Sequence, residues 1–388
     1  MTPTQQQPFY IRFTAILLML LLAGFIIRWA TDIIVPFALS ILLAIVLIPI
    51  NKFLEKRKIP RVYAIAISLV ISFLLIFGVI YFLSTQILNF LDDIPEIKKR
   101  LNGLIHDGQL WAQKRFGIST REQSTYFKNA KGSGSSVIGT TFVSLKDTFL
   151  LLSLLPIYTF LILYYRDMLK RFLVDIFKGS NRERVEDILR ESKGVIQNYM
   201  VGLMIEMVIV ALINFLGFTI IGIDYAIFLA VFAAVLNLIP YIGMLIASIF
   251  CTLITLTTSE DTTQAVWTLV VLWIVQFFDN NIIMPKVVGS KVKINALFTI
   301  LGVFLGGALA GISGMFLAIP GIAILKVIFE RVDNLKPWGM LLSDDITSNR
   351  PGKIYTRVAQ LRKKPPLKPP TPVTPVSVAS GTTQGNGV

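Results

Sequence analysis

The sequence Gln276-Phe-Phe-Asp279-Asn280-Asn281-Ile-Ile-Met-Pro285-Lys286-Val-Val-Gly289 places three consecutive polar side chains at the end of an apolar helix. Such side chains are costly in lipid, because a hydrocarbon core offers them no hydrogen bonds. They therefore either cap a helix at the membrane–water boundary or line a cavity. The apolar run that follows is interrupted by glycines and a proline. This favours the cavity, since broken backbone survives at membrane depth only where protein or water satisfies it.

The composition is that of a polytopic membrane protein. Of 388 residues, 54% are hydrophobic, and the mean hydropathy is +0.70. A soluble domain could not bury so much apolar surface and still cover itself with polar groups. The net charge of +14 is carried by loops and by the C-terminal tail, which indicates contact with anionic lipid and not with nucleic acid.

The N-terminal third predicts three membrane helices, Tyr10–Trp29, Ile33–Ile50 and Arg61–Leu88. The loop between the second and third is strongly basic, so the positive-inside rule places it in the cytoplasm. The N-terminus is then also cytoplasmic. Residues 89–136 predict an amphipathic segment outside the membrane, and 137–165 a fourth membrane helix. Residues 166–198 predict a cytoplasmic amphipathic segment, which is followed by a fifth span, Tyr199–Ile221.

Two later segments have an unusual length. Tyr225–Thr257 and Ala296–Phe329 each contain about 33 residues. A straight helix of that size would be roughly 50 Å long, against a hydrocarbon core of about 30 Å. Since glycines or prolines interrupt both, we expect hairpins of two short halves, with Ala265–Ile283 as one full span between them. Whether the hairpins re-enter or cross the membrane stays open.

The expected fold is therefore an all-α polytopic membrane protein with about eight membrane segments, two of them broken or re-entrant hairpins, plus amphipathic interfacial helices. Residues 1–88 would form a scaffold and 199–340 a transport core containing the hairpins 225–257 and 296–329. Residues 341–388 are rich in proline and basic residues, and predict a disordered cytoplasmic tail.

Candidate site residues gather around the expected breaks and the buried acids. Asn237, Pro240, Tyr241 and Gly243 form a break at which amide and phenol groups could bind a polar solute. A static kink is the alternative. Asp279 and Glu206 are candidate coupling carboxylates, although either could instead be a structural acid facing headgroups or a neighbouring helix. Lys286 is either a partner of Asp279 or a snorkelling flank.

The full set of substrate-site candidates is Asn237, Pro240, Tyr241, Gly243, Asp279, Asn280, Asn281 and Pro285. The helix-break or packing candidates are Gly306, Gly307, Gly311, Gly314 and Pro320.

The sequence contains no recognisable set of residues for enzymatic catalysis. Gly311-Ile-Ser313-Gly314 has the shape of a rhomboid-protease serine motif, but that mechanism needs a histidine base in the membrane. The single histidine, His106, lies in the outer amphipathic segment. Walker A and HExxH sequences are absent, and the one cysteine is Cys251. We therefore expect no enzyme activity, no cofactor and no metal.

Three motifs together resemble the autoinducer-2 exporter (AI-2E) family of PerM-like permeases. These are Asn237-Leu-Ile-Pro-Tyr-Ile-Gly243, Asp279-Asn-Asn-Ile-Ile-Met-Pro285 with Gly289, and the run from Gly306-Gly307 to Pro320. Their order and spacing agree with the family from about Tyr10 to Trp338. The resemblance implies a multi-pass bacterial inner-membrane transporter that works by an elevator-like movement and assembles as a homo-oligomer, specifically a pentamer.

The resemblance leaves the transported species open. Family members are linked to export of autoinducer-2, and others to exchange of sodium or lithium for protons. We expect Asn237, Tyr241, Asn280 and Asn281 to bind a small polar solute, with Asp279 and Glu206 coupling transport to H⁺ or Na⁺. A different class of function, a membrane scaffold that transports nothing and recruits partners through its cytoplasmic segments, remains as an alternative.

Overall fold

The computed structural model describes residues 8–92, 145–177, 179–259, 261–287 and 294–344, together with isolated positions between 99 and 115 and residues 385 and 387. Residues 1–344 form one compact unit, which is the subject below. The predicted outer amphipathic segment, Gly289 and the predicted tail lie largely or wholly outside the described residues.

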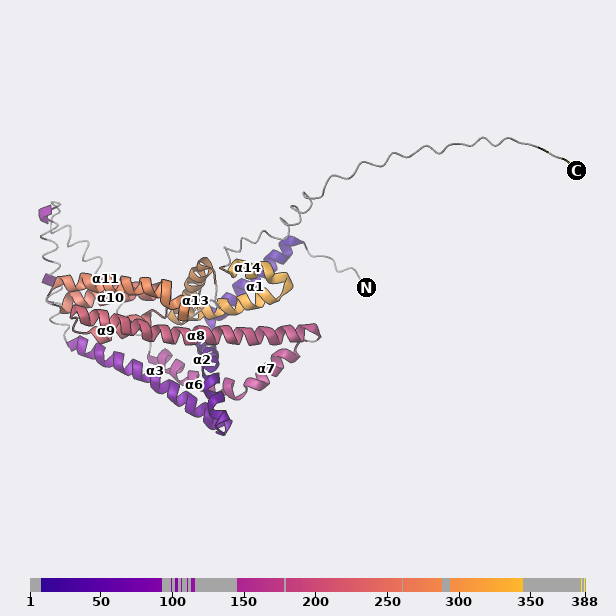
Figure 1. Ribbon diagram of the computed structural model, residues 1–388, viewed down its shortest axis with the longest axis horizontal. Coiled ribbons are helices and arrows are strands. Elements are labelled where there is room, and N and C mark those ends of the chain that lie inside the picture. The colour runs from indigo at the N-terminus through magenta and orange to yellow at the C-terminus, as the bar shows by residue number, and fades with distance from the viewer. Residues whose placement is uncertain are drawn as a thin grey trace. The chain divides into compact units, whose positions relative to one another are not determined.

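The described part is helical, apart from a single β-bridge between Ile294 and Ser343 (Figure 1). Its elements are α1 Phe9–Trp29, α2 Thr31–Lys56, α3 Arg61–Asp92, α6 Leu145–Tyr164, α7 Arg166–Asp175, α8 Ser180–Ile221, α9 Ala226–Leu236, α10 Ile242–Thr258, α11 Thr262–Phe278, a π-helical segment Asp279–Ile283, α12 Met284–Val287, α13 Ala296–Arg331, a 3₁₀ turn Asp333–Leu335 and α14 Lys336–Leu342.

Within the described residues, five helical stretches are long and apolar enough to cross a bilayer. They are Thr31–Lys56, Arg61–Leu88, Asn181–Ile221, Thr262–Val287 and Ala296–Arg331, and shorter apolar helices accompany them. The predicted fold class, an all-α polytopic membrane protein, is confirmed.

Helices α2, α3 and α6 pack as one group around Ala44, Leu47, Ile65 and Leu163. Polar side chains inside this group satisfy one another: Ser68 Oγ lies 3.1 Å from Asn51 Oδ1, and both residues are fully buried. The group has its own buried cluster, although Leu42 of α2 belongs to another cluster with α8 and α13. It holds two of the three helices of residues 1–88, for which the sequence analysis proposed a scaffold, together with α6; α1 contacts α13 and α2.

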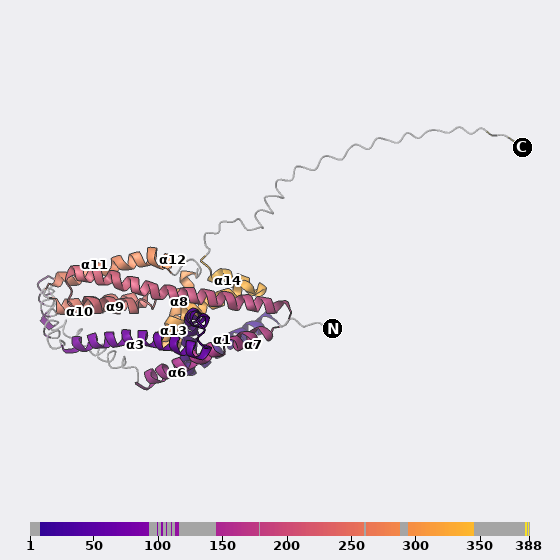
Figure 2. The same cartoon turned by 60° about the horizontal axis from the view of Figure 1, so that its bottom comes forward.

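Helix α8 is continuous over 42 residues, where the sequence analysis separated a cytoplasmic segment from a membrane span at 198–199. The helix continues through this point because no proline or turn signal interrupts the stretch. At 1.5 Å per residue the helix is roughly 60 Å long, so it can cross a bilayer and still project beyond it. Helices α9, α10 and α11 lie alongside its C-terminal half in two views (Figures 1 and 2).

The first predicted hairpin consists of α9 and α10, which are broken between Asn237 and Tyr241. Tyr241 adopts φ +64°, an unusual backbone conformation for a residue with a side chain. A glycine is required two residues later, at Gly243, because a Cβ there would lie 1.7 Å from the Leu236 carbonyl oxygen. The halves then pack against each other and against α8 through a core that contains Phe218, Phe228 and Cys251.

The second predicted hairpin is α13, whose helical geometry fails at Ala310 and Gly311. Gly311 has φ +60° and ψ −146°, a region open mainly to glycine. The halves fold back on each other, since a Cβ on Gly306 would lie 2.3 Å from the Gly314 carbonyl oxygen. A Cβ on Gly307 would likewise meet Met315. Pro320, predicted as a break or packing residue, is buried inside the second half and does not break it.

Candidate functional site

Three elements meet around one carboxyl group. They are the middle of α8, the break after α9, and the π-helical segment that continues α11. The apolar side chains Val210, Ala234, Val275 and Ile283 form a buried cluster at this junction. Within it, Asp279 is 2% exposed and Glu206 is 6% exposed. An acid buried to this degree must be paired, hydrogen-bonded or protonated.

The π-helical segment accounts for the position of Asp279. It begins at Asp279 itself, and the Met284 N–H closes a wide turn onto the Asp279 carbonyl. Such turns insert an extra residue into a helix and occur frequently at functional sites. The turn directs the Asp279 side chain towards α8 and α9, and away from the outer face of α11.

Asn237 supplies the first partner of this acid. Its Nδ2 donates a hydrogen bond of 2.9 Å to Asp279 Oδ2. Asn237 ends α9, so the first residue of the helix break is tied to the first residue of the π turn. The bond therefore connects two irregular stretches of backbone that are 42 positions apart in the chain.

Glu206 supplies the second partner. The carboxyl group of Glu206 lies close enough to that of Asp279 for the two acids to interact. Two carboxyl groups can hydrogen-bond to each other only when one of them carries a proton, because an ionised carboxylate only accepts. No donor among the described residues reaches Glu206 Oε2 or Asp279 Oδ1, and both atoms are buried. The junction can therefore hold one exchangeable proton between two acids.

Basic side chains do not neutralise this pair in the part of the chain that the structure describes. Lys286, considered from the sequence as a partner of Asp279, is exposed on α12 and makes no ion pair with it. Removal of the proton would therefore leave two negative charges in contact inside an apolar cluster, which favours binding of either a proton or a cation. The described residues contain no group of three or more His, Cys, Asp and Glu side chains that could hold a metal ion.

The structure brings together three of the predicted site residues, Asn237, Asp279 and Glu206. Asn280 and Asn281 instead face outward and are satisfied by their own helix. Asn280 Oδ1 accepts a 3.2 Å bond from Gln276, and Asn281 donates a 2.7 Å bond to the Phe277 carbonyl. Pro285 is also exposed. Pro240 and Gly243 shape the break, and Tyr241 is 58% exposed beside it.

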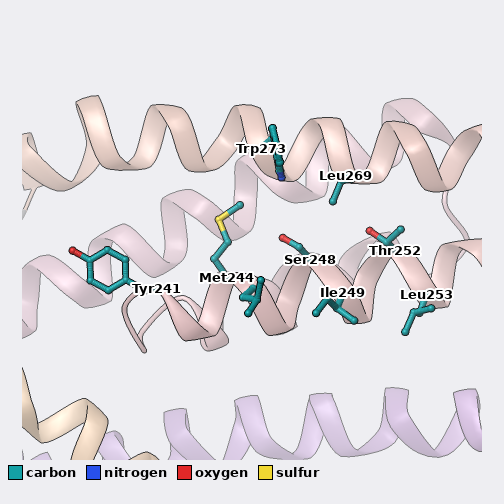
Figure 3. Close-up of a pocket in the computed structure, with 9 residues that line it drawn as sticks. Tyr241, Met244, Ser248, Ile249, Thr252, Leu253, Leu269 and Trp273 are labelled. Atoms are coloured by element: carbon teal, nitrogen blue, oxygen red, sulfur yellow. The ribbon is translucent and has the colours of Figure 1, made fainter. Parts of the chain in front are cut away.

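A pocket that the sequence analysis did not identify lies between α10 and α11 (Figure 3). Its volume is about 520 Å³, and it begins at Tyr241. Helix α10 contributes Met244, Leu245, Ser248, Ile249, Thr252 and Leu253, and α11 contributes Leu269 and Trp273. The signal in the sequence was the pair of hydroxyl residues Ser248 and Thr252, which at a spacing of four share one helical face.

The buried face of α8 carries other polar groups that sequence reasoning did not assign to the site. Tyr199 and Asn214 lie on the same face as Glu206, and both are buried. Their spacing of seven and eight residues from Glu206 is the helical repeat that could have identified them. The Asn214 Oδ1 atom is buried without a partner in the described structure.

Comparison with known proteins places this geometry in a wider context. A family model described as "AI-2E family transporter" matches residues 15–334. The chain is 27% identical over 308 residues to "Putative transport protein YrrI" of Bacillus subtilis (strain 168), which covers 76% of this chain and 84% of that protein. It is also 27% identical over 328 residues to "Putative permease PerM" of Escherichia coli (strain K12), covering 81% of this chain and 92% of that protein.

Proposed function

Since the chain belongs to the AI-2E transporter family, we propose that it is a proton-coupled exporter of a small polar solute such as autoinducer-2. The observation that carries this proposal is the buried contact of Asp279 with both Glu206 and Asn237. A proton shared by two acids gives the coupling ion a site. The amide of Asn237, at the break of the first hairpin, is hydrogen-bonded to one of those acids. Binding of a proton at the site therefore changes a contact that the broken hairpin makes.

The arrangement of cores supports an elevator-like movement. The group formed by α2, α3 and α6 has its own core, whereas α8 packs with α9, α10 and α11 around another. Hairpin α13 also packs on α8, through Val303, Ile319 and Leu203, and Leu42 of α2 joins this cluster. We infer that α8 and the two hairpins move together against α2, α3 and α6, with the contact at Leu42 as the surface that slides.

A second candidate is antiport of Na⁺ or Li⁺ against protons. The same junction favours it, because two carboxyl groups supply the oxygen ligands that hard cations prefer. In an antiporter the cation and the proton compete for one site. In the exporter the proton is the sole ion there, and the solute binds elsewhere.

For orientation we rely on the charge of the loops, and for location and assembly on the family. We propose that both termini are cytoplasmic and that the chain lies in the inner membrane as a homo-oligomer, specifically a pentamer. The large apolar side chains exposed along α1 and α3, among them Phe25, Leu74 and Tyr81, support burial in lipid or against other subunits.

Purified full-length protein in liposomes containing an internal pH dye tests these candidates. A proton gradient is imposed, and autoinducer-2 and NaCl are added in separate experiments. We expect autoinducer-2 alone to change the dye signal. A response to Na⁺ alone would establish the antiporter instead. A lack of response to both, combined with no uptake of labelled autoinducer-2, would contradict transport of either and favour the scaffold.

A further inference from the structure

Among the described residues, none that lines the pocket between α10 and α11 carries a charge. The nine described lining residues are apolar or aromatic except for Ser248 and Thr252. A charged ligand would lose its hydration there and gain no counter-charge, which is strongly unfavourable. The volume of about 520 Å³ falls in the range of small-molecule sites. The pocket therefore suits an uncharged ligand with substantial apolar surface.

The two hydroxyl groups have no hydrogen-bond partner in the part of the chain that the structure describes. Ser248 is only 8% exposed, and its Oγ is buried and unpaired. The Thr252 Oγ1 is likewise buried and unpaired. Both side chains lie on the α10 face that meets α11, with the pocket between the two helices (Figure 3). Unsatisfied buried hydroxyls are uncommon in proteins, and at a pocket they indicate an absent ligand or water.

The other hydroxyl residues of α10 behave differently. Thr255 and Thr258 each donate a 2.9 Å bond to a carbonyl one turn back along the helix, and Thr257 does the same to Leu253. Residues of this type in a helix normally make such bonds when nothing else is available. Ser248 and Thr252 have equivalent carbonyls one turn back and leave them unused. Their hydroxyls are thus distinguished from their neighbours by facing the pocket.

We propose that this pocket binds an uncharged amphipathic small molecule that carries at least one hydroxyl group. Its hydroxyl groups hydrogen-bond to Ser248 and Thr252, and its carbon skeleton packs on Met244, Leu269 and Trp273. The pocket begins at Tyr241, in the same helix break as Asn237. The statement that its ligand belongs to the substrate class of the exporter rests on the proposed function. As a binding site the pocket stands on the geometry alone.

Photolabelling with a diazirine-bearing octanol tests the site directly. Full-length protein in lipid nanodiscs is irradiated with the alkanol, and adducts are located by peptide mass spectrometry. We expect saturable labelling on α10 and α11 within the pocket residues, displaced by 1,2-hexanediol. A diazirine-bearing alkane without a hydroxyl should give no saturable labelling there.

Matched variants test whether the two hydroxyl groups, and not some other property of α10, account for binding. The double variant Ser248→Ala, Thr252→Val should need about tenfold more hexanediol for displacement, since two hydrogen bonds are lost. Thr257→Val makes the same change at a hydroxyl that is bonded to its own helix, and should displace like wild type. Equal displacement in all three proteins would overturn the proposal.

Other occupants of the pocket give distinct results. A lipid acyl chain predicts equal labelling by the alkane and the alkanol, and a second copy of the chain predicts none; either outcome overturns the proposal. No step of this assay needs transport or a proton gradient. Labelling that survives in Asp279→Asn would therefore support the pocket even if the coupling proposal failed, and normal coupled transport without labelling would remove the pocket alone.

Discussion

Asn237 Nδ2 lies 2.9 Å from Asp279 Oδ2, so the amide that ends α9 is bonded to the acid that begins the π turn after α11. The bond joins the two places where this part of the membrane bundle departs from α-helical geometry. Because Glu206 reaches the same acid from α8, three elements depend on the state of one carboxyl group.

Asn237→Ala should abolish solute transport and destabilise the protein. It leaves Asp279 Oδ2 buried without its donor, a loss of about 1–3 kcal/mol. Asn280→Ala is the matched control, because that amide is exposed and bonded within its own helix, and we expect it to transport normally. Flux in liposomes and thermal unfolding in detergent measure both effects. Equal loss of flux in the two variants would show that the hydrogen bond from Asn237 to Asp279 is not what transport requires.

Asp279→Asn and Glu206→Gln should each uncouple transport from the proton gradient while the protein stays folded. The double variant should be no worse than either single variant, because both changes remove one shared proton site. Asp261→Asn, at the exposed cap of α11, makes the same chemical change far from that site and should remain coupled. The internal pH dye reports the result, and full coupling in Asp279→Asn would refute the assignment.

Gly306→Ala should destabilise the hairpin of α13 by overpacking, at a cost of about 1–3 kcal/mol. A methyl group there would lie 2.3 Å from the Gly314 carbonyl oxygen. Gly321→Ala is the control within the same helix, because no atom of the described residues lies within 4 Å of the added Cβ. Alanine favours a helix over glycine, so this variant should unfold at the same temperature or higher. Thermal unfolding in detergent compares the two proteins.

Gly311→Ala should destabilise the same hairpin for a different reason. No atom lies within 4 Å of an added Cβ, but the backbone has φ +60° and ψ −146°. A residue with a side chain pays about 1–3 kcal/mol in such a conformation. An unfolding temperature equal to that of Gly321→Ala would show that the hairpin can turn without this geometry.

The ion pairs of Asp333 should make the N-terminal end of α8 sensitive to acid. Hydrogen bonds from Lys336, then from Arg184 of α8, hold the pKa of Asp333 below its usual value of 3.8. A lowered pKa means that the stabilisation is present above about pH 4 and is lost as pH falls through the folded-state pKa. Asp333→Asn should therefore unfold at a lower temperature than wild type at pH 7 and at the same temperature near pH 2.

Salt provides the control for that comparison. The ion pair between Arg184 and Asp333 is exposed, with 41% and 59% of the two side chains accessible. Screening at about 1 M NaCl should therefore remove most of the difference between wild type and Asp333→Asn at pH 7. A difference that persists at high salt would indicate that packing, and not charge, carries the effect.

The sequence predicted the fold class and the broken segments because these depend on local chemistry. Apolar runs of known length identify membrane helices, and the two segments of about 33 residues fit no single span. The first break falls within Asn237–Gly243, where proline and glycine occur together. The second falls at Gly311, one of several glycines that the sequence offered, and only the packing of Gly306 on Gly314 explains why the chain turns there.

The candidate site was predicted in part. Asn237, Asp279 and Glu206 were identified as polar groups in apolar surroundings, but the sequence could not pair them. Asn280 and Asn281 were grouped with Asp279 because they are adjacent in the chain. Adjacent residues in a helix point about 100° apart, so three consecutive side chains cannot share one narrow site. In the structure only Asp279 is buried, and its two neighbours face outward.

The sequence by itself thus determined that this chain crosses a membrane, which of its segments are broken and which residues are costly to bury. The tertiary structure alone decided which of those residues meet. Contact between Glu206, Asn237 and Asp279 depends on the rotational phase of α8 and of the π turn, and on packing between segments far apart in the chain. Local sequence patterns fix the conformation of each segment, whereas the relative phase of two segments is set by the side chains that interlock between them.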